Sequence, residues 1–169
     1  MPANINRTKA LSLLVAAGSV FVGGAANAAT ASTTFAVNAT VVPACLVSAN
    51  PLVFGNYDPT QGTNLDVTTT LLVTCTVGTS FRVGLSAGGG IGATVTSRKM
   101  TNGANTLGYA LFQDSLRTTN WGNTPGTDTP AATVAPATAS TLTVYGRVAA
   151  GQNVPAATYT DTITVTVTY

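Results

Sequence analysis

The sequence contains no histidine and no glutamate, and only 7% of its 169 residues are charged. Soluble domains average about 25% charged residues. Because histidine and glutamate supply many of the general acids and bases in enzymes, few routes to acid–base catalysis remain. Lys99 is the one lysine outside the first ten residues, so the many Ser and Thr hydroxyls also lack their usual activating base. The sequence therefore predicts a protein that is not an enzyme.

What the sequence does contain favours strands and turns. It has 32 threonines, 17 glycines and 8 prolines, together with abundant valine and alanine. Short segments that alternate apolar and polar residues recur between turn-forming residues, and no segment has a helical period. The predicted strands are residues 34–42, 52–54, 67–76, 80–86, 107–114, 141–149 and 158–169. Seven such strands predict an all-β protein of the immunoglobulin-like sandwich type, with residues 124–140 as a long loop that holds at most a short edge strand.

The N-terminus has the features of a signal peptide. Arg7 and Lys9 precede an apolar run over residues 10–22, and Ala26-Asn27-Ala28 provides a small-residue cleavage signal. The apolar run is shorter than the roughly 20 residues that span a bilayer. We expect residues 1–28 to be removed by cleavage between Ala28 and Ala29, and the rest of the chain to be exported.

Two cysteines, Cys45 and Cys75, are present. Export to an oxidising compartment favours a disulfide between them over a free pair. A metal site is disfavoured, because there is no histidine and no carboxylate lies near either cysteine in the sequence.

Beyond residue 28 the five basic and five acidic residues cancel, which leaves no electrostatic surface for nucleic acid. Arg98-Lys99 is interpreted as a solvated turn. The Gly88–Gly92 segment is interpreted as a hairpin loop, since a dinucleotide-binding loop must be followed by a helix and residues 93–96 favour none. No cofactor and no metal are expected.

The two ends of the exported chain are uncharged and prone to form strands. Near the C-terminus, Ile163, Val165, Val167 and Tyr169 alternate with threonines, and residues 34–42 alternate in the same way just before Pro43. Exposed sheet edges normally carry Lys, Pro or inward-pointing charges that prevent pairing between molecules. Either both segments are covered within one domain, or one pairs with another molecule.

These features together resemble the spore coat U domain family, which includes the major subunits of archaic chaperone-usher pili. The resemblance rests on the signal peptide, the alternating segment before Cys45, the cysteine spacing, Leu52-Val53-Phe54-Gly55 and the ending from Tyr159 to Tyr169. It covers the whole exported chain. It implies domain bounds of 1–28 for the signal peptide, 29–43 for an N-terminal extension and 44–169 for the sandwich.

The resemblance further implies an incomplete immunoglobulin-like fold whose missing strand comes from another molecule. A periplasmic chaperone would fill the groove first. As an outer-membrane usher assembles the fibre, residues 34–42 of another subunit, called here the donor segment, would replace the chaperone in the groove. The inward-facing plugs would be Phe35, Val37, Ala39 and Val41, and the groove would be bordered by Ile163, Val165, Val167 and Tyr169. Ala39 is small for a plug, so its pocket is shallow or the register differs by two residues.

The expected function is therefore a structural subunit of an extracellular pilus, exported through the periplasm to the cell surface and serving adhesion and biofilm formation. Its partners would be identical subunits, a chaperone and an usher, without nucleic acid or a small-molecule cofactor. One alternative is a self-contained secreted binding module, for example a carbohydrate-binding one, although lone aromatics such as Tyr109 and Trp121 are more often core residues. A spore or cyst coat protein is another.

Overall fold

The computed structural model describes residues 28–169, so the expected signal peptide lies outside the described part except for its last residue, Ala28. The chain divides into two units; the first ends at Ala39 and the second begins at Thr40. Residues 28–39 form no strand, and their side chains are exposed. All the strands formed by residues 28–169 belong to the second unit.

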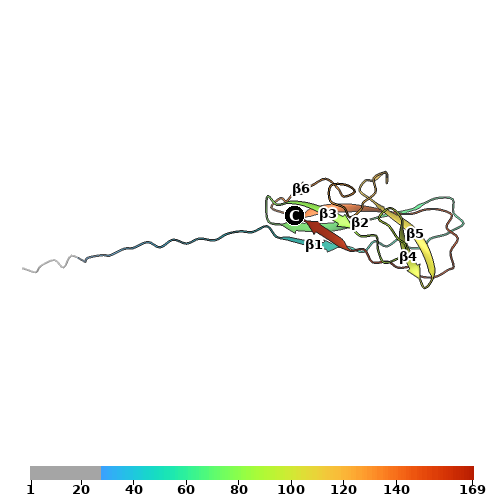
Figure 1. Ribbon diagram of the computed structural model, residues 1–169, viewed down its shortest axis with the longest axis horizontal. Helices are drawn as coiled ribbons and strands as arrows, with labels where there is room; N and C mark the ends of the chain where they lie inside the picture. The colour runs from blue at the N-terminus through green and yellow to red at the C-terminus, as the bar shows by residue number, and fades with distance from the viewer. Residues whose placement is uncertain (1–27) are drawn as a thin grey trace, which may run out of the picture. The chain divides into compact units, whose positions relative to one another are not determined.

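That unit consists of two antiparallel sheets, so the prediction of an all-β protein is confirmed (Figure 1). The five-stranded sheet has the order β1-β2-β7-β5-β4, and the three-stranded sheet has the order β6-β3-β8. The strands are β1 (Cys45–Ala49), β2 (Leu65–Cys75), β3 (Ser80–Leu85), β4 (Arg98–Asn102), β5 (Asn105–Phe112), β6 (Thr133–Val134), β7 (Ser140–Val148) and β8 (Val165–Thr168). Within residues 28–169, no helix is long and apolar enough to cross a membrane.

The core lies between the sheets and follows from the alternation in the strands. In β3, for example, Phe81, Val83 and Leu85 are buried, and in β7 Val144 and Val148 are buried. Trp121, only 1% exposed, packs in the same cluster and donates a hydrogen bond from its indole nitrogen to the Val83 carbonyl, at 2.8 Å. Tyr109 is also buried, so both aromatics are core residues and neither offers a surface on which a sugar could stack.

The strand predictions hold for β2, β3, β5 and β7 within two residues at each end, and β6 is the short strand within residues 124–140. Three predictions differ from the structure. Residues 34–42 form no strand within the chain, residues 52–54 belong to no ladder, and only Val165–Thr168 of residues 158–169 is a regular strand. A strand is defined by pairing with a neighbour. Residues 34–42 and 52–54 have no such ladder, and residues 158–164 have only isolated contacts such as the Thr101–Thr160 bridge. Strands β1 and β4 were not predicted.

Cys45 and Cys75 form the expected disulfide. The two residues face each other at the start of the antiparallel β1–β2 pair. A cross-link that closes a loop of this length contributes about 3.5 kcal/mol in the chain-entropy picture. The disulfide therefore fixes the point at which the chain enters the sandwich.

The prediction of a solvated turn at Arg98 is wrong. Arg98 lies on β4, and its side chain is 0% exposed. The guanidinium donates hydrogen bonds to four main-chain carbonyls, at Leu85 (3.0 Å), Ser86 (2.8 Å), Val95 (2.5 Å) and Trp121 (2.7 Å). Burial lowers the pKa of Arg98 from its usual value, but the four acceptors stabilise the charged form. The side chain therefore ties the end of β3 to β4 and to the segment after β5.

Candidate functional site

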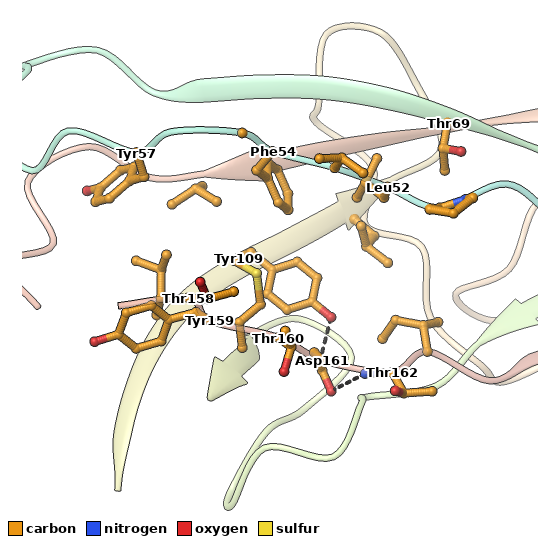
Figure 2. A pocket seen from close by; sticks show the side chains of 18 of the residues that line it. Leu52, Phe54, Tyr57, Thr69, Tyr109, Thr158, Tyr159, Thr160, Asp161 and Thr162 are labelled. Atoms are coloured by element: carbon orange, nitrogen blue, oxygen red, sulfur yellow. Dashed lines mark hydrogen bonds between the residues drawn. The ribbon is translucent and has the colours of Figure 1, made fainter. Parts of the chain in front are cut away.

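A long apolar groove opens along one side of the sandwich. Its volume is about 1060 Å³. One wall is the segment of residues 49–57, which follows β1, and the other is the segment of residues 154–163, which leads into β8. Figure 2 shows labelled residues of these two walls on opposite sides of Tyr109, which lies between them. The floor is made of core side chains from the strands beneath, namely Leu71, Leu85, Leu107, Tyr109, Leu111, Val144 and Val148.

The first wall is held close to the five-stranded sheet. Leu52 and Phe54 are half-buried and lie over Gly146 of β7. A Cβ atom at position 146 would lie 2.7 Å from Leu52 Cδ2 and 3.0 Å from Phe54 Cζ, so any larger residue would push these two side chains away from the sheet. Phe54 also packs edge-on against Tyr109, with ring centroids 5.9 Å apart. Beyond Asn50, whose nitrogen donates a hydrogen bond to the Thr70 carbonyl, the wall is therefore packed onto the sheet by its side chains, without a ladder of main-chain hydrogen bonds.

The second wall has one paired edge and one open edge. Thr160 exchanges main-chain hydrogen bonds with Thr101, and the Thr164 carbonyl accepts a hydrogen bond from the Ser86 nitrogen at 3.0 Å. Further along, β8 pairs with β3 and forms the outer edge of the three-stranded sheet. Its other edge has no strand partner among the described residues. Main-chain groups along such an edge are available to another strand.

Asp161 joins the second wall to the floor. Its carboxylate accepts hydrogen bonds from the Tyr109 hydroxyl, the Gly89 nitrogen and the Thr162 nitrogen, each at 2.7 Å. Two of these contacts are drawn in Figure 2. Burial, aided by the bond to Asp161, raises the pKa of Tyr109, so its hydroxyl stays protonated and remains a donor. Gly88 has a φ of +84°, and a Cβ there would overlap the Asp161 carboxylate.

We expect Asp161→Ala to loosen the second wall. The substitution leaves the buried Tyr109 hydroxyl without its acceptor, which costs about 1–3 kcal/mol. Hydrogen exchange at residues 158–164 should accelerate at least tenfold, and exchange in β2 should change much less. The control is Asp58→Ala, because Asp58 bonds only within its own exposed turn. Equal exchange in the two variants would contradict the role given to Asp161.

The structure places the predicted site residues in two groups. Ile163 and Val165 are half-buried and line the groove. Val167 pairs with Val83 of β3 and does not line the groove. Tyr169 is 59% exposed and does not line the groove. The four predicted plugs are all exposed and belong to no strand, namely Phe35 (84%), Val37 (81%), Val41 (80%) and Ala39.

Sequence reasoning did not identify Asp161, Tyr109 or Gly146 as parts of this site. The Asp161 contacts join segments 52 and 72 residues apart, and no local motif reports such a contact. Gly146 interrupts the buried row of β7 between Val144 and Val148, and an isolated glycine within a strand is a signal of close approach by another segment. That signal was present in the sequence.

The structural class is an immunoglobulin-like sandwich with an open groove, bordered by a strand that has one open edge among the described residues. A family model described as "Spore Coat Protein U domain" matches residues 31–166. The chain is 37% identical over 175 residues to a protein named "Protein U" from Myxococcus xanthus, a match that covers 95% of this chain and 97% of that protein. This protein belongs to the spore coat protein U domain family, as its sequence resemblance predicted.

The fold is also similar to a solved structure. The match is to a chain in the crystal structure of the CsuC-CsuE chaperone-tip adhesion subunit pre-assembly complex from the archaic chaperone-usher Csu pili of Acinetobacter baumannii. The TM-score is 0.58 with 25% sequence identity, and the match covers 77% of this chain. It covers 40% of the other chain, so this protein spans less than half the length of that relative.

Proposed function

We propose that this protein is a structural subunit of an extracellular fibre of the archaic chaperone-usher type. In the fibre, residues 34–42 of one copy fill the groove of the next, and before assembly a periplasmic chaperone fills it. An outer-membrane usher assembles the fibre, which serves surface adhesion and biofilm formation. Residues 1–28 act as a signal peptide, residues 29–43 as the donor extension and residues 44–169 as the sandwich.

The observation that carries this proposal is the groove. Apolar side chains line it, including half-buried ones on its walls such as Leu52, Phe54 and Ile163, and it runs beside an edge of β8 that has no strand partner among the described residues. An apolar groove and an unpaired strand edge are both unfavourable in water, and an added strand would cover the apolar walls and pair with the free main-chain groups. The pairing of such a groove with an uncharged, alternating segment in the same chain favours a second copy as the occupant.

The expected strength of such a joint follows from the plugs. Burying Phe35, Val37 and Val41 would contribute about 1.5–3 kcal/mol each, and Ala39 less. The added main-chain hydrogen bonds would contribute further. Dissociation of one joint would have to break all of these together, so the fibre would be long-lived.

The experiment that tests this function removes the donor segment and then returns it. A chain that lacks residues 29–42 should bind a chaperone but form no fibres. A synthetic peptide of residues 33–42 should bind this truncated subunit and raise its melting temperature, whereas a scrambled peptide of the same composition should not. Fibres of normal length from the truncated chain, or equal shifts with both peptides, would contradict the proposal.

A coat protein is the second candidate, and the description of the matching family favours it. Copies would still associate through the groove, but in a surface layer and without an usher. Electron microscopy of material from the native host separates the two, because the pilus proposal predicts filaments at the cell surface and the coat proposal predicts a continuous layer around a resting cell.

A further inference from the structure

Thr76, the residue after β2, holds the point at which the donor segment leaves the sandwich. The Thr76 nitrogen donates a hydrogen bond to the Ala44 carbonyl at 2.8 Å. The Thr76 hydroxyl accepts one from the Ala44 nitrogen at 3.1 Å and donates one to the Val42 carbonyl at 3.3 Å. Residues 42–44 are thus fixed by a single side chain and its own main chain.

These contacts continue the direction of β1. The last paired residues of the β1–β2 ladder are Cys45 and Cys75, joined by the disulfide, and Ala44 and Thr76 extend the antiparallel pairing by one residue. The hydrogen bond from the Thr76 hydroxyl to the Val42 carbonyl extends this contact by two more residues toward the N-terminus. The chain therefore enters the sandwich in line with β1, without a bend between residues 42 and 45.

A donor segment in its own groove would need the opposite course. The first groove wall, residues 49–57, is the direct continuation of β1. To lie beside that wall, residues 34–42 of the same chain would have to reverse and run antiparallel to it. The reversal would form a hairpin whose two loop residues are Pro43 and Ala44.

Two features oppose that hairpin. The favoured two-residue hairpin turns need a positive φ at their first residue, and the proline ring fixes φ near −65°. The reversal would also break the bonds from Thr76 to Val42 and Ala44. A turn placed earlier in the chain would use Ala39–Val41 as loop residues and remove two plugs from the strand.

We propose that Thr76 is a positioning residue which, together with Pro43, keeps the donor segment out of its own groove and directs it to a second copy. This inference rests on the proposed function. It assigns the choice between self-closure and assembly to two residues outside the groove.

The test measures how much of the protein closes on itself. The exported chain, residues 29–169, is refolded at low concentration with its disulfide intact, and monomers are separated from assemblies by size-exclusion chromatography. Each monomer fraction is then incubated with a fluorescent peptide of residues 33–42. The measured quantity is the amount of monomer that does not bind the peptide. The double variant Pro43→Gly/Thr76→Val should give at least five times as much of it as the unchanged chain.

Matched variants separate positioning from folding. Thr76→Ser keeps the hydroxyl and should behave as the unchanged chain. Thr74→Val removes a neighbouring exposed hydroxyl of β2 that makes no bond to residues 42–44, and it should have no effect. Pro43→Gly alone keeps every Thr76 bond and should give a fraction of closed monomer between those of the unchanged chain and the double variant. If Thr76→Val lowers the folded yield, the comparison of Pro43→Gly with the unchanged chain tests the inference instead.

The outcomes distinguish this inference from the proposed function. If the unchanged chain neither assembles nor binds the peptide, the proposed function fails. If the unchanged chain assembles and binds the peptide, but Pro43→Gly and the double variant give the same closed fraction as it does, Thr76 and Pro43 have no positioning role and the inference is overturned.

Discussion

The variant Val37→Asp should form no fibres, although it should fold, cross-link its cysteines and bind a chaperone as the unchanged chain does. Val37 lies in residues 28–39, where no strand forms and the side chains are exposed, so the substitution leaves the sandwich intact. Assembly is read by electron microscopy and by the resistance of joints to dissociation in detergent.

The size of this effect follows from the groove. Among the residues that line it, Asp161 is the only charged one, and it carries the same sign as the new carboxylate. An aspartate at position 37 would lose the apolar contribution of valine and would bury a charge without a partner. Together these cost about 4 kcal/mol or more, which weakens each joint about a thousandfold.

Asn38→Asp is the matched control, because it places the same charge on the neighbouring residue, whose side chain points to the opposite face of a strand. It should assemble normally. Normal fibres from Val37→Asp would place Val37 outside the groove and would favour a different register of the donor segment. Loss of fibres in both variants would show that charge anywhere in the segment is enough.

The variant Arg98→Met should unfold at a temperature at least about 10 °C lower than the unchanged sandwich. The substitution preserves the length of the side chain but removes all four hydrogen bonds to main-chain carbonyls, of which two are buried and two are part-buried. Each buried acceptor left unsatisfied costs about 1–3 kcal/mol and each part-buried hydrogen bond that is lost about 0.5–1.5 kcal/mol, so the free energy of unfolding should fall by about 4 kcal/mol. Thermal melting followed by circular dichroism measures the change.

Arg82→Met is the control for Arg98, because Arg82 is half-buried and donates one hydrogen bond, to the Pro130 carbonyl at 3.1 Å. It should lose about 1 kcal/mol. Equal losses in the two variants would mean that the four carbonyls find other donors once the guanidinium is removed, and that Arg98 does not organise the end of β3.

The longer strands of the fold were predictable from the sequence, whereas β1 and β4 were not, although each pairs with a neighbour within the chain. Periodicity located β2, β3, β5 and β7, and the cysteines located the disulfide. Periodicity also predicted strands at residues 34–42 and 52–54, where none forms, and over the whole of 158–169, where only Val165–Thr168 is a strand. Alternation reports the preference of a segment for an extended conformation, whereas a ladder also needs a partner. The last two of these segments border the groove.

The inner supports of the site were not predictable. Arg98 was interpreted as a solvated turn because a charged residue is usually exposed, and only the four carbonyls gathered around it make burial favourable. The contact between Asp161 and Tyr109 likewise depends on the packing of β5 against the second wall. Such contacts arise from tertiary geometry, and neither residue type nor spacing specifies them.

The scarcity of charge in the groove has a consequence for the environment in which assembly could take place. The donor segment carries no ionisable side chain, and Asp161 is already occupied by three donors. Attraction across a joint would therefore be apolar and main-chain in origin, which dissolved ions screen very little. Fresh water and brine would leave such a fibre equally intact, and salts of the sulfate type, which strengthen apolar burial, would tighten it.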